Sequence, residues 1–542
     1  MVADGRTAGD KRHMHHVTPA TPLETLAIWG TEALEAVIAI DSASDERSTT
    51  IPSTEGQRTL SAALSARFAA QGFDVSSDDF ANLLVQIPPS PGCEAAPTTA
   101  LMVHMDTAHG ARPLASLLMA PGWDGSRIAY PQNDRLHVDA ASYPLLQAFV
   151  GDDVLHGPGD VPFGLDDKLG MAELMTMATL LKAEPALPHG PLVLVFRPDE
   201  EIGRMDAVMG LAAALKSRGV SFAYTADGLS PFEINVENFD AARARVRVPG
   251  QPLPASSTAA RRLRIHLTGV NTHGAMAMSE GYRNATVIAA RALAGRCGVT
   301  ATSFLSEDEP ETSAILEVRL TGDNTGTIDA VESGLLQALE HEIAPARRRG
   351  AELRIMERSD VDSSSNATTD AAARALALVH DLATSPGPMP RLSEDSDHFD
   401  GYTNPHRIIM DGDDLVVDVR LRDFKPDQLT ARKDHVSRCA NAHNLVADVV
   451  DQYVNMGPVL ARFPQVPRYA EEAARRVGVV AQRRPIRGGT GVDPFLDVGI
   501  PVANLGTGYF APESEKELTS RQNIARHVLW FTALVGVVAE QR

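Results

Sequence analysis

A chain of 542 residues is too long for one hydrophobic core, so we expect two or three domains. Its formal charge of −20 repels nucleic acids and anionic membranes, and neither is expected as a partner. The three cysteines are too few and too widely spaced for a disulfide framework, which predicts a cytoplasmic location. Residues 1–20 are polar, lack the apolar core of a signal peptide and predict a disordered tail.

Helical and strand-like patterns alternate between residues 21 and 245. Helical periodicity covers 22–40, 59–71 and 168–182, and apolar strand-like runs cover 83–87, 99–104 and 192–196, with a further strand ending near Thr225. This βαβ rhythm predicts an α/β fold with a mixed, mostly parallel sheet flanked by helices. Ligands of such sheets bind at the carboxyl ends of the strands.

A different pattern covers 246–453 and predicts an inserted α+β domain. Leu316–Leu320 and Val417–Leu421 are near copies, and each is followed by a helical stretch and another strand-like run. We interpret them as a duplicated β-α-β unit, with an extra segment at about 300–395. The α/β pattern resumes at 454–542 and ends in a helix over 521–540. The first domain is therefore predicted to combine 21–245 with 454–542.

Four short blocks combine one imidazole with many carboxylates. They are His104-Met-Asp106-Thr107, Gly164-Leu-Asp166-Asp167-Lys168, Pro198-Asp199-Glu200-Glu201-Ile-Gly203 and Ala226-Asp227-Gly228. Residues two apart on a strand share a face, so Asp106 can hold the second ring nitrogen of a metal-bound His104. Each block alone also fits a packed histidine, a helix cap or an acidic turn. Together they supply the ligand types of a two-metal hydrolytic site.

The set of motifs resembles peptidase T, the tripeptide aminopeptidase group of the co-catalytic zinc exopeptidase family, which also includes carboxypeptidase G and aminoacylase. The segments that carry the resemblance are His104–Thr107, Gly164–Gly170, Leu187–Gly203, Tyr224–Ala242, Gly269–Ala277, Arg422–Phe424, Pro485–Thr490 and Gly499–Tyr509. The resemblance implies a zinc-exopeptidase-like catalytic domain at 21–245 and 454–542. It also implies that 246–453 is a lid or dimerisation domain.

The resemblance further implies two divalent metals and a cis peptide between Asp166 and Asp167. The first metal, zinc, would be held by His104, Asp166 and Asp227. The second would be held by Asp166, Glu201 and a histidine near the C-terminus.

Catalytic and substrate-binding roles also follow from the resemblance. Glu200 would be the general base for attack by a metal-bridging water, and Asp106 would orient His104. His273 would help to bind the substrate, and Arg422 and Arg487 would bind its carboxylate.

The chain departs from the family at the last metal ligand. Glu513 stands where the family has the ligand histidine, and Gly491 stands where it has an aspartate. A second site with oxygen ligands alone suits harder ions than zinc. We therefore expect manganese or cobalt there, or weak occupancy.

These observations favour a metal-dependent exopeptidase that acts on short peptides, with aminopeptidase activity of the tripeptidase type. One alternative is a carboxypeptidase or N-acyl-amino-acid deacylase of the same family. Another is a catalytically impaired, peptide-binding homologue, which Glu513 motivates. The resemblance also implies a homodimer formed through the inserted domain, or a monomer if the duplicated unit mimics the partner's contact.

Overall fold

The computed structural model describes residues 18–253, 259–268, 284–306, 313–322, 327–349, 351–361, 369–385, 387, 390–393, 399–412 and 414–541. Residues 1–17 of the predicted tail, and His273, lie outside these ranges. The chain divides into two compact units. Unit 1 comprises Met1–Val236, Met456–Pro485 and Thr490–Arg542, and unit 2 comprises Glu237–Asn455 and Ile486–Gly489. The predicted division at 245/246 and 453/454 stays a prediction.

Unit 1 is built on an eight-stranded sheet with the order β1-β2-β6-β3-β7-β19-β8-β18. These strands are β1 (Asp74–Ser77), β2 (Leu83–Ile87), β3 (Thr98–His104), β6 (Leu192–Arg197), β7 (Val220–Gly228), β8 (Glu233–Asn238), β18 (Gln482–Ile486) and β19 (Val502–Gly506). The central strands β6, β3, β7 and β19 are parallel, whereas β1, β2 and β8 pair antiparallel. The predicted mixed α/β sheet is confirmed, with its parallel part at the centre.

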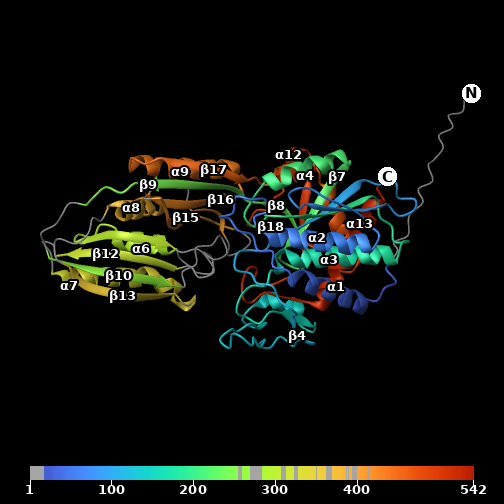
Figure 1. The fold of residues 1–542 in the computed structure, drawn as a ribbon, viewed down its shortest axis with the longest axis horizontal. Coiled ribbons are helices and arrows are strands. Elements are labelled where there is room, and N and C mark those ends of the chain that lie inside the picture. Colours follow the sequence, from blue (N-terminus) through green and yellow to red (C-terminus); the bar gives the residue numbers. More distant parts are fainter. Residues whose placement is uncertain are drawn as a thin grey trace, which may run out of the picture. The chain divides into compact units, whose positions relative to one another are not determined.

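The helices of unit 1 cover this sheet (Figure 1). They are α1 (Leu23–Ile38), α2 (Glu55–Ala70), α3 (Leu165–Ala183), α4 (Asp206–Ser217), α10 (Gly457–Leu460), α11 (Gln465–Arg476), α12 (Asp493–Asp497) and α13 (Arg521–Ala539). Helices α1, α3 and α13 pack against one another, and α3 is buried along most of its length. The predicted C-terminal helix is confirmed as α13. Among the described residues, no helix combines the length and apolar character needed to cross a membrane.

A small sheet in unit 1 joins two segments that are far apart in the sequence. It has the order β20-β5-β4, from β4 (Leu118–Ala120), β5 (Val154–His156) and β20 (Leu518–Ser520), with the 3₁₀ helix η1 (Pro144–Phe149) nearby. Trp123, Phe149 and Leu518 belong to its apolar core. This pairing fixes the chain after residue 509 beside the chain that leads into α3.

Unit 2 contains two antiparallel sheets, with the orders β11-β12-β10-β13 and β14-β15-β16-β9-β17. Their strands are β9 (Asp240–Val248), β10 (Ala260–Thr268), β11 (Val299–Ser306), β12 (Ser313–Thr321), β13 (Glu352–Val361), β14 (Arg391–Leu392), β15 (Phe399–Asp411), β16 (Asp414–Asp423) and β17 (Ala447–Tyr453). The helices are α6 (Ala285–Leu293), α7 (Ile328–Ile343), α8 (Ala371–Thr384) and α9 (Pro426–Ala442), with the 3₁₀ helix η2 (Ala344–Arg349).

The predicted duplication is present and is larger than expected. The near-copied segments lie in β12 and β16, each followed by a helix and a strand, as predicted. Strand β10 pairs with both β12 and β13, and β9 pairs in the same way with both β16 and β17. Each copy also has a preceding helix and strand, α6–β11 or α8–β15. The copies are nested, because the whole first copy lies between β9 and α8 of the second.

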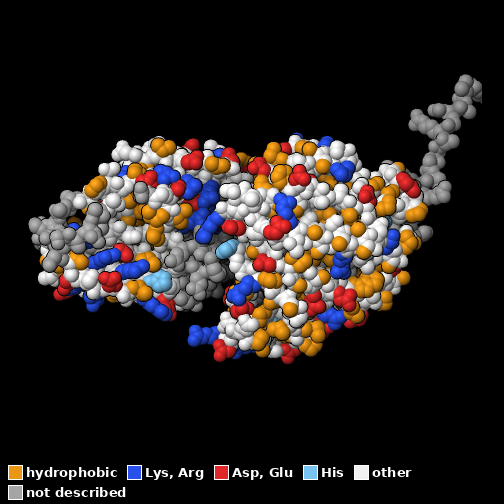
Figure 2. All heavy atoms as spheres, viewed as in Figure 1, with side chains coloured by type: hydrophobic (Ala, Val, Ile, Leu, Met, Phe, Trp, Pro, Cys, Tyr) orange, Lys and Arg blue, Asp and Glu red, His pale blue; other side chains and the backbone are white. Residues whose placement is uncertain are grey.

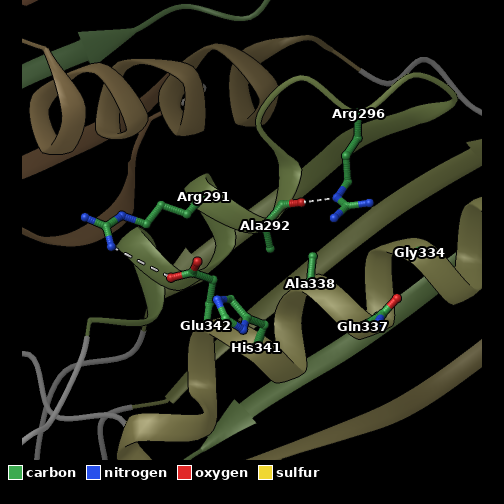
Figure 3. A pocket seen from close by; sticks show the side chains of 8 residues that line it. All are labelled: Arg291, Ala292, Arg296, Gly334, Gln337, Ala338, His341 and Glu342. Atoms are coloured by element: carbon green, nitrogen blue, oxygen red, sulfur yellow. Dashed lines mark hydrogen bonds and ion pairs between the residues drawn. The ribbon is translucent and has the colours of Figure 1, made fainter.

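A surface pocket of about 370 Å³ lies between α6 and α7 of unit 2 (Figure 3). Arg291 reaches across it to Glu342, and the Arg296 side chain donates a hydrogen bond to the backbone oxygen of Ala292. None of its lining residues is among the predicted site residues. On the face shown in Figure 2, acidic and basic side chains are interspersed among the described residues of each unit.

A buried histidine makes the stability of unit 1 sensitive to acid. The His527 ring is stacked on Phe232, and its Nδ1 hydrogen-bonds to the backbone oxygen of Asn523 at 2.9 Å. Burial lowers the pKa of His527 from 6.5 to about 3. Between these values the unfolded chain binds a proton that the folded chain does not. The contribution of His527 to the free energy of unfolding should therefore fall by about 1.4 kcal/mol for each pH unit below about 6.5, whereas buried carboxyl groups with raised pKa values, such as Glu517, act in the opposite direction.

Denaturant unfolding at pH 7 and at pH 5.5 measures this effect. In His527→Gln the unfolding free energy should fall by less between pH 7 and pH 5.5 than in the wild type, or rise by more, whatever the variant's absolute stability. An equal difference in the wild type and in the variant would contradict the assignment.

Candidate metal centre

His104 ends strand β3, and its imidazole is buried. Its Nδ1 lies 2.9 Å from the backbone oxygen of Asp106, and because a carbonyl oxygen only accepts, this nitrogen carries a proton. The Nε2 atom faces Asp166 Oδ1 at 3.0 Å and Asp227 Oδ1 at 3.4 Å. Burial works against a charged imidazole, yet the attraction of Asp227 and hydrogen bonds with Asp106 and Asp166 raise the pKa of His104 well above its usual value. Carboxylates that stabilise a proton on Nε2 also favour a cation at the same position.

Asp106 links strand β3 to the loop that carries two site glutamates. Its carboxylate accepts the backbone N–H of Glu200 at 2.9 Å and that of Glu201 at 3.1 Å. The preceding Asp199 has a left-handed backbone with a φ of 52°, and its carboxylate accepts the backbone N–H of Ser53 at 2.8 Å. The loop is therefore fixed at both sides, and it follows β6 as predicted.

Asp166 reaches the site from the start of α3 rather than from a strand of the large sheet. Its segment begins this helix just after the small sheet, in agreement with the helical periodicity predicted from Lys168. The Asp166–Asp167 peptide is cis, as predicted. Glu517 fixes this segment, since its Oε2 accepts the backbone N–H groups of Phe163 and Gly164, each at 2.9 Å.

The predicted ligands lie together in two overlapping sets. One set is His104, Asp166 and Asp227, the other is Asp166, Glu201 and Glu513, and within each set the ligand atoms lie within 4.8 Å of one another. Among the described residues, Glu201 Oε1 is buried without a hydrogen-bond partner. Burial and the neighbouring carboxylates raise the pKa of Asp227 to about 7. Burial and Glu513 also raise the pKa of Glu201 well above its usual value. This excess of buried carboxylates around one imidazole fits divalent cations.

Glu513 occupies the position predicted for the last ligand. It has a φ of 53°, its side chain is exposed, and its backbone N–H donates to Glu517 Oε1 at 3.1 Å. The same glutamate, Glu517, therefore holds both the Asp166 segment and the Glu513 turn.

Arg197 is a site residue that the sequence analysis did not find. Its guanidinium is 2% exposed, lies 3.6 Å from Glu200 Oε1, and donates hydrogen bonds to the backbone oxygens of Thr490 and Gly491. A Cβ atom at Gly491, whose φ is 54°, would collide with this guanidinium. Arg197 thus fills the space that an aspartate at 491 would need. The signal was a basic residue between an entirely apolar strand and the Pro-Asp-Glu-Glu block.

Tyr509 is a second site residue that was not predicted from the sequence. Its hydroxyl donates to Asp166 Oδ2 at 2.7 Å from a buried position. The sequence offered no signal for this contact, because 343 residues separate the two side chains.

The two predicted carboxylate-binding arginines belong to unit 2, and both have partners there. Arg487 pairs with Asp400 at 2.6 Å, and its guanidinium lies 5.7 Å from the centre of the Phe424 ring. Arg422 donates to Gln452 Oε1 at 3.0 Å and stacks on Tyr453. Their predicted role, like that of His273, stays a prediction.

The large sheet, the inserted unit and the two ligand sets match the architecture expected of a two-metal exopeptidase. The chain is 34% identical over 216 residues to peptidase T of Desulfitobacterium hafniense, which covers 39% of this chain and 51% of that protein. It is 24% identical over 485 residues to peptidase T of Staphylococcus carnosus, which covers 88% of this chain and 90% of that protein. The predicted resemblance to peptidase T is confirmed. No family model matches the chain.

The chain spans about half the length of the first curated relatives that it matches. Among solved structures, aminoacylhistidine dipeptidase from Vibrio alginolyticus is similar, with a TM-score of 0.58 and 16% sequence identity. This similarity covers 95% of this chain and 98% of that chain, and it confirms the predicted fold class.

The Asp106 carboxylate can be tested by Asp106→Asn. The amide accepts one backbone N–H instead of two and presents a donor to the other. The affinity for divalent metal should fall by about 10–100-fold, as is typical when an outer-shell partner is lost. Titration of the metal-free protein with Zn²⁺ measures this affinity. Asp124→Asn, at an exposed carboxylate, is the control, and equal affinities of the two variants would refute the role of Asp106.

Proposed function

We propose that the protein is a metal-dependent exopeptidase that hydrolyses short peptides. The observation that carries this proposal is the pair of ligand sets that share Asp166, with Glu200 in electrostatic interaction with His104 and Asp166. The names of the curated relatives and the shared fold support it. We further propose cleavage after the N-terminal residue, in agreement with the aminopeptidase that the motifs resemble.

Two divalent cations suit this centre. His104, Asp166 and Asp227 would hold one, with zinc favoured by the imidazole, and Asp166, Glu201 and Glu513 would hold the other. The second set has only oxygen atoms, which favours manganese or cobalt, or weak occupancy. When bound, such cations polarise the scissile carbonyl and make a water molecule more acidic.

Glu200 is proposed as the general base, since its side chain is mostly buried and is oriented through its backbone N–H. Burial raises the pKa of Glu200, while His104 and Arg197 act in the opposite direction. A base whose pKa is moved toward neutrality takes a proton from the attacking water and returns it to the leaving amine more readily. Asp106 contacts both the His104 ring, through its backbone oxygen, and the Glu200 backbone N–H, through its carboxylate. One residue therefore positions the proposed base and a ligand of the first set.

Substrate binding, cellular location and oligomeric state are also part of the proposal. Arg422, Arg487 and His273 are proposed to bind the peptide, which for Arg487 requires exchange of Asp400 for the substrate carboxylate. The three free cysteines support a reducing, cytoplasmic setting. The nested duplication supports a monomer in which one copy takes the place of a partner, and a homodimer is the alternative.

Glu200→Gln should lower turnover by about 10²–10⁴-fold, the range that general-base catalysis contributes, while metal binding is retained. The assay is a panel of tripeptides, dipeptides and N-acylated amino acids with zinc, manganese or cobalt. Glu472→Gln, on the surface helix α11, is the control. Preference for tripeptides would support the proposal. A wild type without turnover of any substrate, but with tight peptide binding, would show an impaired homologue instead.

Glu513→His should restore an imidazole to the second ligand set and move its preference toward zinc. Elemental analysis after dialysis against zinc should give about two ions per chain for the variant and fewer for the wild type. Two firmly held zinc ions in the wild type would contradict the proposed weakness of the second site.

A further inference from the structure

Tyr509 and the ligand Asp227 lie near the ends of two neighbouring strands. Strand β19 runs parallel to β7, which ends with Asp227 and Gly228. Just after β19, Thr507 donates its backbone N–H to Gly228 at 2.9 Å, and Tyr509 donates its own to Leu229 at 3.0 Å. The backbone of Tyr509 is therefore tied to the loop that follows Asp227.

The residue before Tyr509 adds to this fixation. Gly508 has a φ of 82°, and a Cβ atom there would collide with the Asn523 side chain. The same Asn523 amide donates to the backbone oxygens of Thr507 at 2.8 Å and Gly508 at 2.9 Å. The turn has little freedom, which fixes the backbone that carries Tyr509, and the ring itself is packed in the apolar core of unit 1.

The two carboxylate oxygens of Asp166 have different partners. Oδ1 faces His104 Nε2 at 3.0 Å, on the side of the first ligand set. Oδ2 accepts the Tyr509 hydroxyl at 2.7 Å. The side chain of Tyr509 is only 5% exposed, so water does not compete freely for this bond.

We propose that Tyr509 is a positioning residue of the metal centre, which fixes the shared carboxylate of Asp166 so that the second, all-oxygen ligand set can hold a cation. This inference rests on the proposed two-metal site.

The need for such a residue follows from the ligands of the second set. The terminal torsion of an aspartate has a broad minimum, and repulsion from neighbouring carboxylates such as Asp227 favours rotation of Asp166. The other two ligands are glutamates, whose longer side chains have more rotatable bonds, so each supplies a less rigid ligand atom. The Tyr509 hydroxyl, on a buried ring, holds Asp166 in one orientation. Its hydrogen bond uses one lone pair of Asp166 Oδ2 and leaves the other lone pair for a cation.

The test is Tyr509→Phe in the full chain, which removes the hydroxyl and keeps the ring. Metal-free protein is titrated with Mn²⁺ and, separately, Zn²⁺, and both equivalents are measured by calorimetry and elemental analysis. The second equivalent should bind about 10–100-fold more weakly than in the wild type, and the first should change less. Metal binding should also perturb the near-ultraviolet tyrosine spectrum of the wild type, and Tyr509→Phe should lose this perturbation.

Tyr224→Phe is the matched control, because Tyr224 is also buried in unit 1 and its hydroxyl donates to the backbone oxygen of Val466 at 2.7 Å. It should keep both the second-equivalent affinity and the spectral change. Wild-type affinity in Tyr509→Phe, or persistence of the spectral change, would overturn the role of Tyr509 alone. A wild type that binds no divalent cation would overturn the two-metal proposal together with it.

Discussion

Buried negative charge is the constraint on which the rest of unit 1 depends. Asp166, Asp227 and Glu201 converge on a single imidazole, and burial raises the pKa of both Asp227 and Glu201. Such a cluster is costly unless hydrogen bonds or cations compensate it. The surrounding fold supplies the hydrogen bonds: Asp106 binds the Glu200–Glu201 loop, Glu517 binds the turn before α3, and the Tyr509 hydroxyl binds Asp166. Within the part of the chain that the structure describes, Glu201 Oε1 keeps no hydrogen-bond partner, so a ligand of the second set is the least compensated part of the cluster.

The parts of the site that could be predicted from sequence are those carried by local patterns. Strand β2 has the predicted bounds, and β3 ends at His104, because apolar runs followed by polar blocks mark the ends of buried strands. The cis peptide and the two ligand sets were expected from resemblance alone. The start of α3 at Asp166 was also predictable, because a glycine turn followed by two acids and a helical periodicity marks a helix N-terminus.

The residues that were missed act through tertiary contacts. Arg197 matters because its guanidinium reaches the turn at Gly491, 294 residues away along the chain. Nothing in the local sequence at either position indicates that the Arg197 guanidinium occupies the space left by the missing side chain at Gly491. The size of the duplication was underestimated because β9 and β10 precede the copied strands at very different distances along the chain, although Arg243 and Arg245 of β9 match Arg262 and Arg264 of β10 in their places opposite those strands.

The nesting of the two copies in unit 2 sets the order in which the chain can fold. The first copy is contiguous from β10 to β13, so its strands can pair as soon as that stretch is synthesised. The second copy must wait, because Asp240 in β9 pairs with Asp423 in β16, on the far side of the whole first copy. Contacts between residues so distant in sequence carry a large loop-closure cost and form slowly. Until β16 and β17 arrive, β9 has two unpaired edges, so the second copy is the part of unit 2 most open to mispairing during synthesis.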